Sequence, residues 1–198
     1  PFAFAPGTGV LYSDVGFMIL GWVVEQVARK GLHEYLAQEL YGPLGIADEL
    51  FFVRLDDPKQ REQRKARVFV ATEECALRGR LLQGEVHDLG AWAMGGVAGH
   101  AGLFGTADAV WRLAHALLAC YEGDGNRFHT GTLKRFWTRS KRVKESTRTL
   151  GWDMPSAIDS NAGKRFSRAS VGHLGFTGTS LWIDLMTGVI GVVLCNAI

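Results

Sequence analysis

Two short segments of the sequence contain the side chains best suited to chemistry. The first is Tyr12-Ser13-Asp14, which directly precedes a predicted helix. The second is His173-Leu174-Gly175, followed by Phe176, on a predicted pair of strands. A phenol, a carboxyl group and an imidazole can relay protons, and a glycine on a strand leaves space beside the backbone for a substrate. These residues are therefore the candidates for a proton-transfer site.

Signatures of several other enzyme classes are absent from the 198 residues. There is no Gly-x-Ser-x-Gly, no phosphate-binding loop, no dinucleotide glycine fingerprint and no Cys-x-x-Cys pair. His33-Glu34 begins like a zinc-protease helix, but the residue four places after His33 is Ala37, so the second ligand is missing. We therefore expect neither a metal site nor an organic cofactor.

Composition and charge favour an ordinary globular chain. Hydrophobic residues make up 47% and charged residues 21%, and the formal net charge is +2. So small a charge predicts neither a nucleic-acid partner nor an anionic membrane surface. The segment Lys134 to Arg148 contains seven Lys or Arg, and we interpret it as a solvated face. No apolar run approaches the roughly 20 residues that a membrane span needs.

Apolar residues recur at helical spacing from Val15 to Lys30, which predicts a helix. Ser13 or Asp14 is placed to cap its first turn, and Gly31 is placed to end it. Thr106 is a plausible cap for a later amphipathic helix. The further helices are expected at Leu32 to Tyr41, Thr106 to Tyr121 and Thr130 to Arg139.

Near the C-terminal end the pattern changes to short β-type runs. Strands are predicted at Ser170 to Phe176, Ser180 to Asp184 and Val189 to Asn196, with Met186-Thr187-Gly188 as a hairpin turn. We expect consecutive antiparallel strands, with Leu174 packed against the helices and the outer edge paired with a preceding segment or another chain. Helices therefore come first and a sheet comes last.

Two polar segments have more modest predicted roles. Asp56 to Arg67 is almost wholly polar, which indicates an exposed loop or a short solvated helix. His87 and Asp88 lie in a glycine-rich stretch, and we expect them to orient a loop by hydrogen bonding and not to act in catalysis.

The motifs together resemble a known family. Pro6-Gly7 followed by Tyr12-Ser13-Asp14 and Val15-Gly16-Phe17 resembles the Tyr-x-Asn loop and the following helix of class C β-lactamase-like hydrolases. The glycine-rich run from Gly95 to Phe104 resembles the segment before a long helix of the same family, and the likeness continues from His173 to Asn196. The chain therefore resembles the serine β-lactamase and penicillin-binding-protein superfamily over most of its length.

The resemblance implies an α+β fold, with a helical region and an antiparallel β-sheet flanked by helices, incomplete at both ends. It implies that residues 1–198 are a fragment of a single catalytic domain, mainly helical to about residue 150 and then antiparallel strands. It also suggests a periplasmic or other extracytoplasmic location. The expected partners are a small-molecule or peptidoglycan-like substrate, and a missing N-terminal segment or another chain that completes the sheet.

The resemblance also implies roles for individual residues. In the family, a Ser-x-x-Lys helix supplies the nucleophile, and a loop tyrosine relays protons. The catalytic residues carried over are Tyr12, Asp14 and His173, and the substrate-binding residues are Gly175 and Phe176, with the Phe176 backbone N–H as an oxyanion donor. Taken singly, Tyr12 is better explained as a packed aromatic and Asp14 as a helix cap, and it is the paired context that favours catalytic roles.

Two positions depart from the family pattern. Asp14 stands where asparagine is usual, and His173 stands where β-lactamases and peptidases have lysine. An aspartate adds negative charge, and histidine is mostly neutral at pH 7. We therefore expect weaker recognition of an acidic substrate end.

No serine of the chain is followed by a lysine three residues later. The nucleophile is therefore expected upstream of Pro1 in a longer protein. The implied activity is that of a serine hydrolase acting through an acyl-serine on an ester, a D-Ala-D-Ala-type amide or a β-lactam, with the isolated chain inactive. The alternative is a non-catalytic binding module of the same fold that recognises cell-wall peptide or a protein partner.

Overall fold

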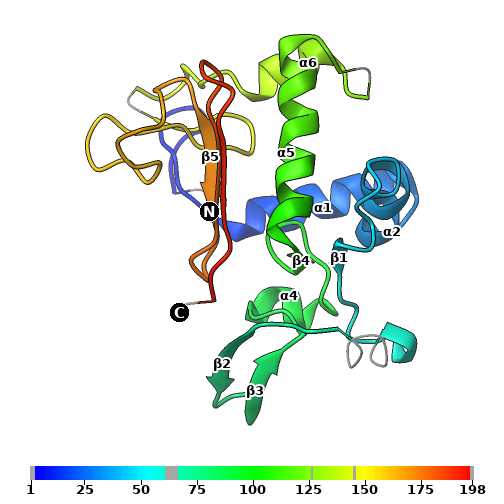
Figure 1. Ribbon diagram of the computed structural model, residues 1–198. Coiled ribbons are helices and arrows are strands. Elements are labelled where there is room, and N and C mark those ends of the chain that lie inside the picture. Colours follow the sequence, from blue (N-terminus) through cyan, green and yellow to red (C-terminus); the bar gives the residue numbers. More distant parts are fainter. Residues whose placement is uncertain (1–2, 61–66, 126, 145, 197–198) are drawn as a thin grey trace. The chain divides into compact units, whose positions relative to one another are not determined.

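The computed structural model describes residues 3–60, 67–125, 127–144 and 146–196 (Figure 1). The chain divides into two compact units. The first compact unit consists of the residues up to Tyr12 together with Val110–Cys195, and the second consists of Ser13–Ala109 together with the residues from Asn196 onward. Helices and small antiparallel sheets make this an α+β fold, as the sequence predicted. None of the helices in the described ranges combines the length and the apolar character needed to cross a membrane.

The first helix of the second compact unit, α1, spans Asp14–Ala28 and confirms the helix predicted at this position. Its N-cap residue is Ser13, whose backbone is extended. The helix ends before Gly31, because Arg29 adopts a left-handed conformation with φ 53°. The Glu25 carboxylate then accepts a 2.8 Å hydrogen bond from the backbone N–H of Leu32, which fixes the start of the next helix.

The second predicted helix is divided into two parts. The α-helix α2 covers Leu32–Leu36, and the π-helix η1 covers Ala37–Tyr41. A π-helical turn is wider than an α-helical turn, because its hydrogen bonds join residues five apart. In η1 this bond runs from the Gly42 N–H to the Ala37 carbonyl. Tyr41 is buried at this point, and burial raises the pKa of its phenol to about 12.

Two small sheets of the second compact unit were not predicted. β1 (Leu50–Phe52) pairs antiparallel with β4 (Leu103–Gly105), and β2 (Ala71–Cys75) pairs antiparallel with β3 (Arg80–Gln83). β1 and β4 have only three residues each, and no β-type run was recognised in the sequence at β2 or β3. A short helix, α4 (Leu89–Ala93), follows β3.

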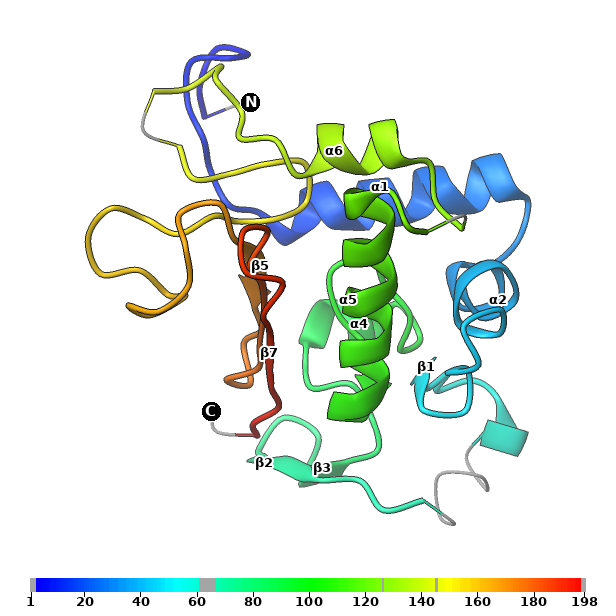
Figure 2. The same ribbon diagram turned by 45° about the horizontal axis from the view of Figure 1, so that its top comes forward.

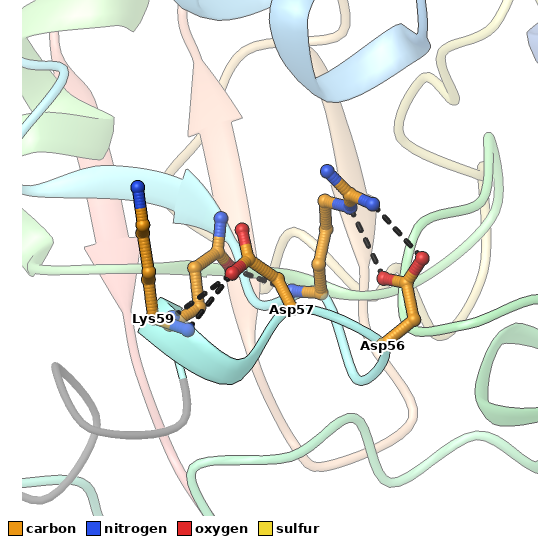
Figure 3. Close-up of polar contacts among 5 residues, drawn as sticks. Asp56, Asp57 and Lys59 are labelled. Atoms are coloured by element: carbon orange, nitrogen blue, oxygen red, sulfur yellow. Dashed lines mark hydrogen bonds and ion pairs between the residues drawn. The ribbon is translucent and has the colours of Figure 1, made fainter.

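The polar segment after β1 forms the exposed turn shown in Figure 3. The Arg54 guanidinium pairs with the Asp56 carboxylate at 2.8 Å. Asp57 accepts a 2.9 Å hydrogen bond from the Lys59 N–H and caps the helical residues 58–60, and the Gln60 side chain accepts one from the Arg54 N–H. The predicted exposed loop or short helix is confirmed here, while residues 61–66 of that prediction lie outside the described ranges.

The first compact unit contains a three-stranded antiparallel sheet in the order β5-β6-β7. The strands are β5 (Val171–Leu174), β6 (Ser180–Ile183) and β7 (Ile190–Val193), which confirms the three predicted strands. β5 and β7 are labelled in Figure 2. The register pairs Val171 with Ile183 and His173 with Leu181.

Helices α5 (Ala107–Glu122) and α6 (Thr130–Phe136) confirm the two later helix predictions. The Thr106 hydroxyl accepts a 3.1 Å hydrogen bond from the Ala109 N–H, so the predicted cap is present. Within the first compact unit, α5 and α6 pack on one face of the sheet (Figure 2). Their shared core contains Ala114, Leu118, Cys120, Leu133, Trp137, Val171 and Ile183.

The expectation that Leu174 packs against the helices was wrong, because its side chain is 43% exposed. Val171 is the β5 residue that faces the helical core. Side chains alternate along a strand, so His173 shares the face of Val171, and Gly172 and Leu174 occupy the other face. The Trp182 ring covers Gly172 so closely that a Cβ there would collide with it.

The outer edge of β5 is partly covered by a preceding segment, as the sequence predicted. Asp153 forms an isolated antiparallel bridge with Gly172. Two backbone hydrogen bonds join these residues, with N···O distances of 2.8 and 2.9 Å. β5 is therefore held on one side by β6 and on the other by Asp153.

The buried Asp184 carboxylate anchors the turn between β6 and β7. Its oxygens accept hydrogen bonds from the Ser167 N–H and hydroxyl at 2.8 and 2.6 Å, and from the N–H groups of Met186 and Thr187 at 2.9 and 3.4 Å. Burial alone would raise the pKa of this carboxyl, but these hydrogen bonds outweigh it and lower the pKa from 3.8 to about 2.

Asp184→Asn should lower the free energy of unfolding at pH 7 by about 2 kcal/mol, the equivalent of that pKa difference. A carboxyl whose folded-state pKa is depressed stabilises the fold above about pH 4, and this contribution disappears as the pH falls through about 2. Urea unfolding at pH 7 and at pH 3 measures the effect, with exposed Asp124→Asn as the control. An equal loss at the two pH values would contradict the assigned role.

Candidate active site

Tyr12 and His173 lie together in the first compact unit, although most of the sequence separates them. Their ring centroids are 6.0 Å apart, and the ring planes are tilted by 36°. The Tyr12 side chain is 55% exposed, so it is not a packed core aromatic. The fold therefore brings together two of the three residues that the sequence indicated as catalytic.

A hydrogen bond to the backbone decides which ring nitrogen of His173 can accept a further hydrogen bond. Its Nδ1 lies 2.6 Å from the backbone carbonyl oxygen of Leu174. A carbonyl can only accept, so Nδ1 carries the proton, and in the neutral ring Nε2 is left as an acceptor. A neutral His173 therefore offers a lone pair at Nε2, whereas a lysine at this position would offer a positive charge.

Arg148 is a third member of this cluster and was not recognised from the sequence. Its guanidinium carbon lies 5.2 Å from the centroid of the Tyr12 ring, within the range of a cation–π contact. In the sequence, Arg148 lies at the end of a basic segment that was interpreted as a solvated face, and this segment shows no pattern that links it to Tyr12. Within the described part of this segment, helix α6 ends at Phe136. Arg148 follows later in the chain, outside any helix or strand.

Gly175 and Phe176 form the turn that follows β5. The Gly175 N–H donates to the Thr179 carbonyl at 2.8 Å, and the Gly178 N–H donates to the Gly175 carbonyl at 3.0 Å. Phe176 is at the tip, with its side chain 79% exposed. A Cβ on Gly175 would collide with the Thr179 hydroxyl. The space that we expected to serve a substrate is therefore filled at least in part by Thr179.

Asp14 belongs to the second compact unit, where it is the first residue of α1 and is exposed. A carboxylate at a helix N-terminus interacts favourably with the helix dipole. This position agrees with a structural role at the start of the helix, and a catalytic role for Asp14 stays a prediction.

His87 and Asp88 orient a loop of the second compact unit, as predicted. The Asp88 carboxylate accepts a 2.7 Å hydrogen bond from the Ala91 N–H, which caps α4, and lies 2.8 Å from His100 Nε2. Burial alone would raise the pKa of the Asp88 carboxyl, but the contacts with Ala91 and His100 lower it overall. The His87 ring contacts the Thr72 hydroxyl at 3.2 Å.

The His100 loop packs directly on the backbone of α1 within the second compact unit. A Cβ on Gly99 would collide with the carbonyl of Phe17, and a Cβ on Gly21 would lie 3.1 Å from the Gly99 nitrogen. The His100 side chain is 3% exposed. The Asp88–His100 contact therefore holds a glycine-rich loop against the helix that follows Tyr12 in the sequence.

Across residues 3–60, 67–125, 127–144 and 146–196, no group of three or more His, Cys, Asp or Glu side chains is arranged to hold a metal ion.

Comparison with known families identifies the class of protein. The model of the Beta-lactamase family matches residues 1–197, and the fold is that of the serine β-lactamase and penicillin-binding-protein superfamily. The chain therefore belongs to the Beta-lactamase family. Its relatives include hydrolases, so the hydrolase class is established for the family.

Two curated relatives match nearly the whole chain. A protein of Escherichia coli (strain K12) named "Putative D-alanyl-D-alanine carboxypeptidase" is 34% identical over 99% of this chain and 47% of its own length. An N-acetylmuramyl-L-alanine amidase of Bacillus subtilis (strain 168) is 35% identical over 93% of this chain and 43% of its own length. The chain thus spans about half the length of these relatives.

Solved structures confirm the fold. Simvastatin synthase (LovD) from Aspergillus terreus superimposes on 98% of this chain and 51% of its own chain with a TM-score of 0.70, at 20% sequence identity. At this identity the likeness concerns the fold and not the substrate.

Gly99→Ala should lower the free energy of unfolding by at least about 2 kcal/mol, because a new Cβ meets the rigid Phe17 backbone. Gly16→Ala in α1 is the matched control. Its Cβ meets nothing within 4 Å, so it should leave stability unchanged or raise it by up to about 1 kcal/mol. Chemical unfolding measures both variants, and equal stability of the two would show that the loop does not pack on α1.

Proposed function

We propose that this chain is the C-terminal part of a serine hydrolase that acts through an acyl-serine, with Tyr12, Asp14 and His173 in its active site. The observation that supports the proposal best is the 6.0 Å separation of the Tyr12 and His173 rings. A tyrosine and a histidine distant in sequence, one before a helix and one on a strand, lie close enough to share one site, which supports the proposed acyl transfer. We also propose that residues 1–198 belong to one catalytic domain, of which they are a fragment.

The proposed reaction has two steps. A serine hydroxyl, supplied by a segment that precedes this sequence in the longer protein, attacks a substrate carbonyl, and the C=O electron pair moves onto oxygen. The Phe176 backbone N–H stabilises that oxyanion, while Tyr12 accepts the serine proton and passes it to the leaving amine as the C–N bond breaks. Water then hydrolyses the acyl-serine, giving a carboxylic acid and the free serine.

The proposed substrate is an amide of the D-Ala-D-Ala type in a peptidoglycan peptide. The names of the two curated relatives, "Putative D-alanyl-D-alanine carboxypeptidase" and "N-acetylmuramyl-L-alanine amidase", favour an amide over an ester. A β-lactam contains the same reacting amide group and is therefore a suitable probe of the acyl-serine.

A second candidate is a non-catalytic module that binds cell-wall peptide or a protein. The observation that favours it is the absence of any Ser-x-x-Lys among the eight serines of this sequence. The two candidates differ in whether a covalent acyl-enzyme forms.

The longer protein should be acylated by a fluorescent penicillin, and the isolated 198-residue chain should not, because the proposed nucleophile lies outside the 198 residues. Labelling is measured by in-gel fluorescence after denaturation. Replacement of the serine in a Ser-x-x-Lys motif of the longer protein by alanine is the control and should abolish labelling. A longer protein without this motif, and without labelling, would support the binding module.

Tyr12→Phe in the longer protein should slow turnover about 30- to 1,000-fold, or about 2 to 4 kcal/mol of barrier, the usual loss for a positioned proton-transfer group. Release of D-alanine from a D-Ala-D-Ala peptide measures kcat and KM. Tyr35→Phe removes the same hydroxyl from α2 and should have no such effect. A Tyr12→Phe rate close to that of the unmodified protein would exclude Tyr12 from the proposed proton transfer.

A further inference from the structure

The two compact units carry opposite charges. The first compact unit contains 12 Lys or Arg and six Asp or Glu, a formal charge of +6, whereas the second contains 10 Lys or Arg and 14 Asp or Glu, a formal charge of −4. The small net charge of +2 is the sum of these two opposite charges. The net charge of the whole chain is therefore no guide to the partners of the first compact unit.

The positive charge is concentrated in residues 127–144, which we call the basic segment. This segment contains seven Lys or Arg and no Asp or Glu, and all seven cations are exposed. Among the residues that the structure describes, no carboxylate forms an ion pair with any of them. The cations are Arg127, Lys134, Arg135, Arg139, Lys141, Arg142 and Lys144.

Helix α6, which lies at the C-terminal end of α5, presents part of the basic segment to solvent (Figure 1). Leu133 and Trp137, four residues apart, are buried in the core of the first compact unit. Residues at the other positions of the helix therefore point outward. Lys134 and Arg135 occupy two of these positions, and Phe136 follows them with a side chain that is 44% exposed.

We propose that the basic segment binds an anionic membrane surface, with its cations at the lipid phosphates and the Phe136 ring in the headgroup layer. Clusters of about four to eight Lys or Arg are attracted to anionic bilayers, because each cation near the surface adds to the binding. An exposed ring that enters the interface also removes apolar surface from water. The proposal is independent of the proposed function, since it involves neither Tyr12 nor His173.

A membrane surface fits this segment better than a nucleic acid does. Bases are read by amide side chains or stacked on successive aromatic rings, and the segment contains no Asn or Gln. Phe128 and Trp137 pack in the helical core, so Phe136 is the single exposed Phe or Trp of residues 127–144. One ring is enough to enter a headgroup layer but does not form a stacking platform for several bases.

Co-sedimentation of the 198-residue chain with lipid vesicles tests the proposal. Vesicles of phosphatidylcholine are compared with vesicles that also contain phosphatidylglycerol, which is anionic. At about 0.1 M salt we expect at least about tenfold tighter binding to the anionic vesicles, and most of this preference should disappear at about 1 M salt, where exposed charges are screened. Equal binding to both kinds of vesicle, or binding to neither, would overturn the proposal.

Matched double variants locate the contact. Arg139→Gln combined with Arg142→Gln should weaken binding to the anionic vesicles about 10- to 30-fold, because each cation near the surface contributes about fivefold. Arg165→Gln combined with Arg168→Gln removes the same charge from other exposed positions of the first compact unit and should weaken binding less than about threefold. Circular dichroism checks the folding of both variants. Equal losses would show that binding follows overall charge, which would reject the basic segment as the contact.

Variants of Phe136 separate the apolar contribution from the charges. Phe136→Ala should weaken binding to the anionic vesicles about three- to tenfold and leave its salt dependence unchanged, because the ring carries no charge. Phe136→Leu keeps an apolar side chain and should retain part of the affinity. Unchanged affinity in Phe136→Ala would place the ring outside the interface and contradict its proposed role.

A DNA duplex is the competing ligand. It is titrated into the 198-residue chain at the same salt concentration and compared with the anionic vesicles at equal phosphate concentration. We expect weaker binding to the duplex, because the single exposed ring contributes nothing to its binding. Binding to the duplex as tight as binding to the vesicles would identify a nucleic-acid surface instead and overturn the proposal.

Discussion

Pairing of β5 along both of its edges is the interaction on which the arrangement of the candidate active site depends. β6 pairs with one edge through four residues, and Asp153 pairs with the other through two short backbone hydrogen bonds. His173 lies on this strand, and Arg148 is bridged to Asp153. Backbone pairing fixes both the register and the direction of a strand. The pairing of β5 therefore sets the positions of the His173 and Arg148 side chains relative to Tyr12.

The two faces of β5 are distinguished by packing. Val171 and Ile183 enter the helical core, and the Trp182 ring covers Gly172 on the opposite face. A shift of the strand by one residue would move Val171 out of the core, which makes the observed register strongly favoured. The hydrogen bonds that Asp184 accepts hold the next turn and stabilise the same hairpin.

Polar contacts also hold a loop in place in the second compact unit. Asp88 caps α4 and contacts His100, and the adjacent glycine-rich loop packs on the backbone of α1. These contacts give Asp88 a structural role, although its residue type is common in catalysis. In the proposed active site the charges are distributed differently from the usual family pattern, with a histidine on the strand and an arginine on the neighbouring segment. Such a distribution keeps a positive charge near Tyr12 without a lysine at position 173.

The sequence by itself determined the features that arise from neighbouring residues. Apolar periodicity located α1 and α5, a threonine marked the N-terminus of α5, and alternating runs located the three strands of the main sheet, because these signals act within a few residues. Resemblance to the family indicated Tyr12 and His173. Tertiary structure alone decided that Leu174 is exposed, that two further short sheets form, and that Arg148 lies over Tyr12. These features depend on contacts between residues far apart in the chain, and such contacts leave no periodic pattern in the sequence.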